Sequence, residues 1–216
     1  QKSFFMLLKI GGILNLYFFS KTLHPSLKNL DANFLIPAQI FFIVSAFRCF
    51  YPVHYTTSTA LHDSYFSSVF LTRILATFSE IAYIYQFSHL IRFLNINHVP
   101  IIDLLSWLMV MQVIISQFYV WQAILTKIQK FYFYEEFGWA IIFILNTTSN
   151  IILFFITEPI NEHMLLIQIN LIFGFIYLPW QFFHLKSIKS KSELQKNKKT
   201  PSILSWKILK TGLIES

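Results

Sequence analysis

The sequence predicts an all-α, polytopic integral membrane protein, with about six transmembrane helices in one bundle and a basic C-terminal tail. Hydrophobic residues make up 55% of the 216 residues and charged residues only 12%, which is about half the charged fraction of a soluble domain. The apolar residues form runs close to the roughly 20 residues that one membrane crossing needs. The lysines are concentrated after residue 185. This composition excludes a water-soluble globule.

The expected spans are separated by short polar or proline-containing segments. A signal peptide is the alternative interpretation of the first run, although its bulky end at Tyr17, Phe18 and Phe19 lacks the small residues of a cleavage site. Asp63 and Ser64 are suitable N-caps for the third span, and residues 127–137 are expected to form a linker. In chain order, the six expected spans are residues 4–19, 33–47, 64–94, 101–125, 138–157 and 164–185.

Residues 1–185 are therefore expected to form the membrane domain, and residues 186–216 a basic, largely disordered cytoplasmic tail. Lys and Arg favour the cytoplasmic side of a membrane, so the tail and the linker that contains Lys127 and Lys130 are placed inside. Six spans then put both termini in the cytoplasm. The net charge of +7 lies mainly in the tail, which favours anionic lipid headgroups over nucleic acid as its partner. Cys49 is the only cysteine, so no intramolecular disulfide forms.

The third span carries two charges well inside its apolar run. Arg73, Thr77 and Glu80 fall on one stripe of a helix, because steps of four and seven residues nearly close whole turns. An isolated charge in hydrocarbon costs from about 2.5 to more than 10 kcal/mol, depending on the reference scale. Arg73 and Glu80 are about 10 Å apart along the axis, so we expect other side chains to bridge them. An intramembrane site and a buried tie between helices both stay open as interpretations.

Amide side chains recur in the following spans. Gln117 is expected at about the depth of Arg73, and Asn146 and Asn150 project together from the fifth span because they are one turn apart. Interhelical hydrogen bonding is the alternative role for such residues. Asp103 lies in the first turn of its span, where a capping role is expected. Gly174 is expected to let another helix approach closely.

Charge and amide residues in three spans favour binding or transport of a small ion or polar solute, or of a lipid ligand, through an intramembrane polar site. The expected site residues are Arg73, Thr77, Glu80, Gln117, Asn146 and Asn150. One alternative is a membrane-embedded enzyme acting on a lipid or isoprenoid substrate, with a metal held by residues chosen from His54, His62, Asp63, Glu135, Glu136 and His184. These residues lack the spacing of a known metal-binding motif, so no metal or other cofactor is predicted. A small membrane scaffold subunit is the third interpretation, and oligomerisation stays open.

Overall fold

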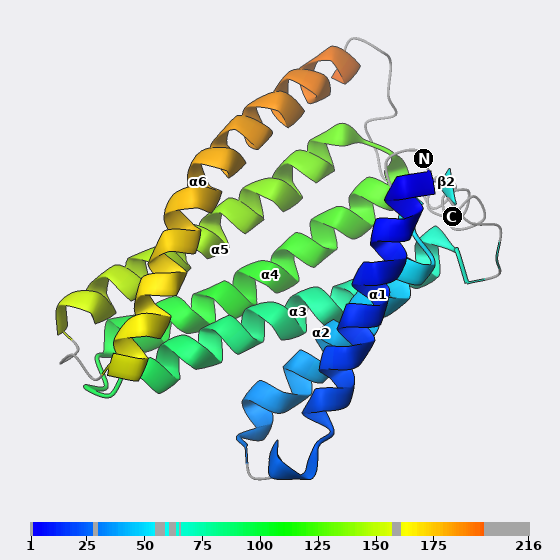
Figure 1. The fold of residues 1–216 in the computed structure, drawn as a ribbon. Coiled ribbons are helices and arrows are strands. Elements are labelled where there is room, and N and C mark those ends of the chain that lie inside the picture. The colour runs from blue at the N-terminus through cyan, green and yellow to red at the C-terminus, as the bar shows by residue number, and fades with distance from the viewer. Residues whose placement is uncertain are drawn as a thin grey trace. The chain divides into compact units, whose positions relative to one another are not determined.

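The computed structural model describes residues 2–27, 30–54, 59–60, 64, 66–156 and 161–196. In this part of the chain the structure is helical apart from a short turn and one small strand pair (Figure 1). The helices are α1 (Lys2–Thr22), α2 (Ala32–Phe50), α3 (Val69–Leu94), α4 (Pro100–Thr126), α5 (Gln129–Ile156) and α6 (Asn161–Lys196). The turn is η1 (Pro25–Leu27), and the strands β1 (Val53–His54) and β2 (Thr59–Ala60) pair antiparallel.

Five helices are long and apolar enough to cross a membrane. Their membrane-compatible parts are Phe4–Thr22 of α1, Ala32–Phe50, Pro100–Thr126, Gln129–Ile156 and His163–Ser190 of α6. Large apolar side chains such as Phe155 and Ile176 are 80% and 70% exposed on these helices, as expected where the surroundings are lipid. This is the pattern of a helical integral membrane protein. The charged helix α3 does not reach the same apolarity, although it has 26 residues.

Helix α3 begins five residues later than the sequence suggested. The Ser68 hydroxyl accepts a hydrogen bond from the Leu71 amide at 3.3 Å, as a residue at a helix start does. Ser64, which was expected to cap the helix, instead accepts from the Phe66 amide in the preceding turn. Asp63 lies outside the described residues. Ser68 therefore sets the start of α3, because its side chain satisfies one of the first helical amides.

The expected linker at residues 127–137 is wrong. Lys127 has a left-handed backbone with φ of 57°, and its amide donates to the Ala123 carbonyl, which closes α4. Helix α5 then begins at Gln129, so the reversal takes two residues. Aromatic packing favours this early start, because the ring of Tyr134 lies 5.3 Å from that of Tyr119 on α4.

Helix α6 continues to Lys196, eleven residues past the expected end of the membrane domain at residue 185. The expectation of disorder is therefore wrong for residues 186–196. Lys, Glu, Gln and Leu are good helix formers, and lengthening an existing helix avoids the cost of nucleating a new one. The remainder of the tail, residues 197–216, lies outside the described residues.

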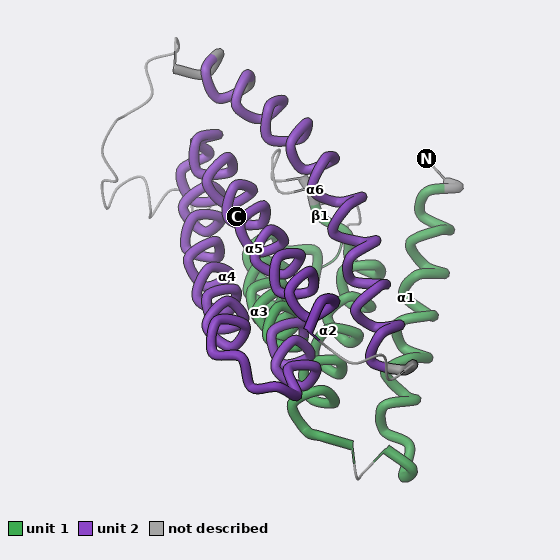
Figure 2. Tube along the Cα trace, turned by 90° about the vertical axis from the view of Figure 1, so that its left-hand side faces the viewer, with its two compact units in different colours: residues 1–86, 206–216 green, residues 87–205 purple. Residues whose placement is uncertain are grey.

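The chain divides into two compact units with their boundary inside α3 (Figure 2). Among the described residues, unit 1 extends to Gln86 and unit 2 begins at Phe87. In unit 1, α1 and α2 form an antiparallel hairpin, with Phe18 stacked on Phe42 at 5.6 Å. At the other end of this hairpin a Cβ on Gly12 would lie 2.9 Å from the Phe50 ring, so the glycine permits the close approach.

In unit 2, α5 packs antiparallel against both α4 and α6. Each contact surface contains one glycine. A Cβ on Gly138 would clash with Ser116 Oγ of α4, and a Cβ on Gly174 would clash with Thr147 Oγ1 and lie 3.2 Å from Thr147 Cγ2. The close helix approach predicted at Gly174 is confirmed. One turn away the rings of Phe143 and Tyr177 are 4.2 Å apart, which fixes the register of α5 against α6.

Candidate functional site

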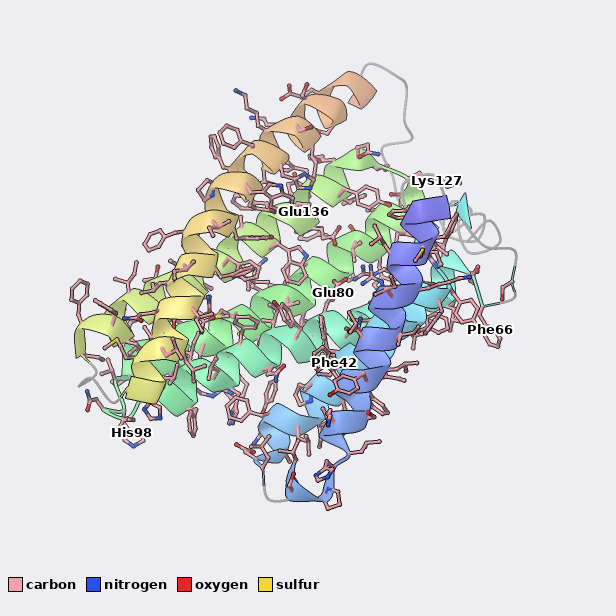
Figure 3. All side chains as sticks on the ribbon, in the orientation of Figure 1. Phe42, Phe66, Glu80, His98, Lys127 and Glu136 are labelled. Carbon is pink, nitrogen blue, oxygen red and sulfur yellow. The ribbon has the colours of Figure 1, made fainter. Side chains whose placement is uncertain are left out.

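Arg73 and Glu80 form a direct, two-pronged ion pair within α3. Arg73 Nη2 donates to Glu80 Oε2 at 2.8 Å, and Arg73 Nη1 donates to Oε1 at 3.2 Å. Their side chains are only 3% and 19% exposed, and Glu80 is labelled on α3 in Figure 3. The prediction that the two charges need a bridging residue is therefore wrong. The axial distance between the two positions ignores the length of the arginine side chain and the tilt of helical side chains toward the N-terminus, which brings the Glu80 carboxylate back toward Arg73.

Thr77 lies on the same stripe, between the two charged residues. Its hydroxyl donates to the Arg73 carbonyl at 3.0 Å, a bond within the helix that serine and threonine often make. The three residues predicted as one stripe therefore form one group in unit 1. Its charges neutralise each other in a paired, charge-assisted geometry.

Asn146 and Asn150 interact on α5, as their spacing of one turn predicted. Asn150 Nδ2 donates to the Asn146 carbonyl at 2.8 Å and lies 3.4 Å from Asn146 Oδ1. Both residues are fully buried. Asn146 Nδ2 and Asn150 Oδ1 have no hydrogen-bond partner among the described residues. One buried donor and one buried acceptor, on side chains one helical turn apart, are thus left without partners among the described residues.

Gln117 does not lie at the level of this asparagine pair. Gly138 faces Gln112 and Ser116, so its level on the antiparallel helix α4 is near position 114. Asn146 lies eight residues beyond Gly138, and eight residues back along α4 from that level is Ser106. Gln117 is eleven residues from Ser106, or about 16 Å of helix. Gln117 is buried, but the register separates it from Asn146 and Asn150.

At the level of Asn146 and Asn150, each helix of unit 2 has at least one polar residue. Thr147 faces Gly174, and Phe143 faces Tyr177, so the same register puts Asn150 opposite Asn170. Ser88 of α3 joins this level because its hydroxyl donates to the Ser106 carbonyl at 2.7 Å. We call this set the polar layer, and each member is at most 7% exposed. Its members are Ser88, Ser106, Asn146, Asn150 and Asn170.

A cation is attached to the polar layer. Arg92 Nη1 donates to Ser88 Oγ at 2.5 Å and to Ser106 Oγ at 3.1 Å, and the guanidinium lies 4.2 Å from the centre of the Trp107 ring. The aromatic face contributes a cation–π attraction. Sequence reasoning missed this group. Its signal was the four-residue spacing from Ser88 to Arg92, which places both side chains on one helix face.

Asp103 does not cap α4 as expected. The N-cap position is Val99, which makes no side-chain cap, and Asp103 Oδ1 accepts from Asn95 Nδ2 at 3.0 Å. Asn95 Oδ1 in turn accepts from the Val99 amide at 3.0 Å. The carboxylate thus ties the preceding turn to α4, while its place in the first turn still suits the helix dipole.

The residues considered for a metal site are joined only in part. Glu136 Oε2 accepts from Gln181 Nε2 at 2.9 Å, and Glu136 Oε1 lies 3.7 Å from His184 Nε2; Glu136 is labelled on α5 in Figure 3. Glu135, the preceding residue in the sequence, is buried. His62, Asp63 and the His54 side chain lie outside what is described. Within the described residues, no three His, Cys, Asp or Glu side chains are grouped so that they could hold a metal.

The two polar groups differ in charge. The Arg73–Glu80 pair in unit 1 matches positive donors with negative acceptors. The polar layer in unit 2 keeps a buried donor and a buried acceptor without partners among the described residues. Comparison of the chain with protein-family models, with curated protein sequences and with solved structures finds no match.

Proposed function

We propose that the protein binds a small polar solute or ion inside the membrane and passes it across, with the polar layer of unit 2 as the binding site. The observation that carries this proposal is that Asn146 Nδ2 and Asn150 Oδ1, on side chains one helical turn apart, are buried and have no hydrogen-bond partner among the described residues. Leaving a buried polar atom without a hydrogen bond costs about 1–3 kcal/mol, and most such atoms in proteins have partners. A solute that accepts one hydrogen bond and donates another removes both costs.

In this proposal Asn146 donates to the solute and Asn150 accepts from it. An amide, an alcohol, a carboxylic acid or water has the matching pair of groups. Arg92, held by Ser88 and Ser106, adds positive charge at the same level and favours solutes with a partly negative oxygen. Arg73, Thr77, Glu80 and Gln117 remain in the proposal as further polar positions along the spans.

The test is solute flux into vesicles that contain the purified protein. Stopped-flow light scattering measures vesicle swelling under inward gradients of urea, acetamide or glycerol, and a voltage-sensitive dye measures ion flux. The double variant Asn146→Leu/Asn150→Leu keeps the branched shape of both side chains but removes their hydrogen-bonding atoms. We expect its flux to fall to the rate of protein-free vesicles. Asn97→Leu is the matched control, because Asn97 bonds the Ile156 carbonyl outside the polar layer.

A melting curve of the same double variant separates this proposal from a purely structural role. Replacing both hydrogen-bonding groups by apolar groups of the same shape is nearly neutral when the pair has unused atoms. We therefore expect an unchanged or higher melting temperature together with lost flux. A strongly lowered melting temperature would identify the pair as a structural tie, and wild-type protein that conducts none of the tested solutes or ions would contradict the proposed transport.

The proposal includes α3 as a sixth span, with both termini in the cytoplasm. Its 26 residues extend about 39 Å, which exceeds the roughly 30 Å of a hydrocarbon core. The charge that makes α3 less apolar than its neighbours is offset by the Arg73–Glu80 pair. The basic residues of the tail favour the cytoplasmic side.

We expect reporter fusions at the two ends of the chain to report the same side of the membrane. Six spans return the chain to the side on which it started, whereas five spans leave the ends on opposite sides. A fluorescent protein that becomes fluorescent only in the cytoplasm should therefore fluoresce whether it is fused to the N-terminus or to the C-terminus. Fluorescence at one end alone would show that α3 does not cross the membrane.

A further inference from the structure

Unit 1 contains a cavity of about 300 Å³ that the proposed solute site does not use. Its polar lining comes from Ser45 and Arg48 of α2 and Thr72 of α3, and Cys49 also faces it. Leu8 of α1, with the segment that follows α2, completes the wall. We call it the Arg48 cavity.

The hydroxyl of Thr72 marks this cavity as a binding site. Thr72 is 1% exposed, and its Oγ1 has no hydrogen-bond partner among the described residues. A threonine on a helix commonly bonds a carbonyl one turn back, as Thr77 does on the same helix. Thr72 lines the cavity, and a buried hydroxyl that forgoes this bond beside a cavity points to a ligand oxygen as its partner.

The chemistry of the lining selects an anionic oxygen. A guanidinium forms charge-assisted, often two-pronged hydrogen bonds to carboxylate or phosphate, and the hydroxyls of Ser45 and Thr72 can donate to further oxygens. An arginine in the last turn of a helix is also stabilised by the helix dipole, but the dipole explains neither the cavity nor the hydroxyl of Thr72.

The position and volume of the Arg48 cavity narrow the choice of ligand further. Arg48 lies in the last turn of α2, and the end of a membrane-spanning helix lies near the lipid headgroups. A volume of about 300 Å³ is at the small end of ligand pockets, which suits a headgroup rather than a whole lipid. We propose that the Arg48 cavity binds a phosphate group, carried by an anionic phospholipid headgroup or by a free phosphate. This site is independent of the solute site, because it belongs to the other unit and takes a different ligand.

Cys49 supplies the assay, because it is the only cysteine in the sequence and it lines the cavity. The rate at which a maleimide labels Cys49 is measured in detergent micelles that contain phosphatidylglycerol, and in micelles that contain phosphatidylcholine. Sodium phosphate is tested separately, against sodium chloride of equal ionic strength. An occupied cavity blocks the thiol, so a ligand at about ten times its Kd should slow the labelling about tenfold.

Two variants of the lining test the assignment. Arg48→Gln removes the positive charge, and Thr72→Val removes the hydroxyl while keeping the branched shape. The matched controls are Lys21→Gln, which removes an exposed charge on α1, and Thr22→Val, whose hydroxyl bonds its own helix. Because Arg48 also changes the reactivity of the neighbouring thiol, protection is calculated for each variant as the ratio of its labelling rates without and with ligand.

We expect phosphatidylglycerol to protect Cys49 in the wild type and in both controls, and protection to be lost in Arg48→Gln and weakened in Thr72→Val. Protection by the lipid alone assigns the site to a headgroup, and protection by sodium phosphate as well assigns it to phosphate in general. Equal protection by phosphatidylcholine, no protection by any anion, or full protection in Arg48→Gln would overturn the proposal. Lost solute flux in the asparagine variants would leave this result unchanged.

Discussion

Removing one charge of the Arg73–Glu80 pair is expected to destabilise the protein much more than removing both. Arg73→Leu leaves the Glu80 carboxylate in a mostly buried position without the two hydrogen bonds from Arg73. Breaking a buried ion pair in this way typically costs about 3–5 kcal/mol. The double variant Arg73→Leu/Glu80→Leu removes both charges, and replacement of a buried pair by apolar residues is often neutral or stabilising. We therefore expect the double variant to recover most of the loss.

The measurement is the free energy of unfolding in mixed micelles, followed by the fluorescence of the five tryptophans. Lys9→Leu, which removes an exposed charge from α1, is the control and should change the stability little. A single variant as stable as the wild type would mean that the pair does not hold the two charges inside the membrane.

Solute flux in Arg73→Leu/Glu80→Leu then decides whether the pair belongs to an intramembrane site or only stabilises the fold, the two interpretations that the sequence left open. Stability recovered together with wild-type flux identifies the pair as a tie within α3. Stability recovered together with lost flux makes the pair part of the solute path.

Gly174→Ala is expected to loosen the packing of α5 against α6. The added methyl group would clash with Thr147 Oγ1 and lie 3.2 Å from both Cβ and Cγ2 of Thr147. Thr147 cannot turn away easily, because a β-branched side chain has few rotamers in a helix and its hydroxyl bonds the Phe143 carbonyl. Overpacking of this kind costs about 1–3 kcal/mol, and we expect a matching drop in the free energy of unfolding.

Gly11→Ala is the matched control. A Cβ at Gly11 meets only Cys49 Sγ at 3.5 Å, which is ordinary contact, and alanine is favoured over glycine inside a helix by about 0.5–1 kcal/mol. This variant should therefore be neutral or slightly stabilised. Thr147→Ala added to Gly174→Ala should restore part of the lost stability. If Gly174→Ala alone is as stable as Gly11→Ala, the close approach of the two helices at this point is wrong.

The sequence predicts contacts within one helix better than levels between helices. The stripe of Arg73, Thr77 and Glu80 and the pairing of Asn146 with Asn150 both follow from the helical repeat, and the structure has them. The direct contact of Arg73 with Glu80 was missed, because the rise along the axis says nothing of side-chain reach. The separation of Gln117 from the level of Asn146 and Asn150 could not be read from the sequence, because the register of α4 against α5 depends on small-residue packing such as Ser116 against Gly138.

The predicted helix boundaries were wrong where apolar content alone was used to place them. Residues 129–137 and 186–196 are polar enough to suggest loops, yet the first segment begins α5 and the second continues α6. A membrane span ends where the lipid ends, whereas a helix ends where its backbone is capped. The capping signals at Ser68 and Lys127 were present in the sequence, but only the structure tells a serine that caps from one that does not.

The length of α6 gives small motions at its packing contact a large effect at its end. From Gly174 to Lys196 the helix is continuous over 22 residues, or about 33 Å. If α6 pivots about the contact of Gly174 with Thr147, each degree of rotation displaces its end by about 0.6 Å, as follows from that length. A small rotation at this contact is therefore enlarged at the basic end of α6. A partner or membrane surface that holds the lysines at this end would in turn restrain how closely α6 lies against the polar layer.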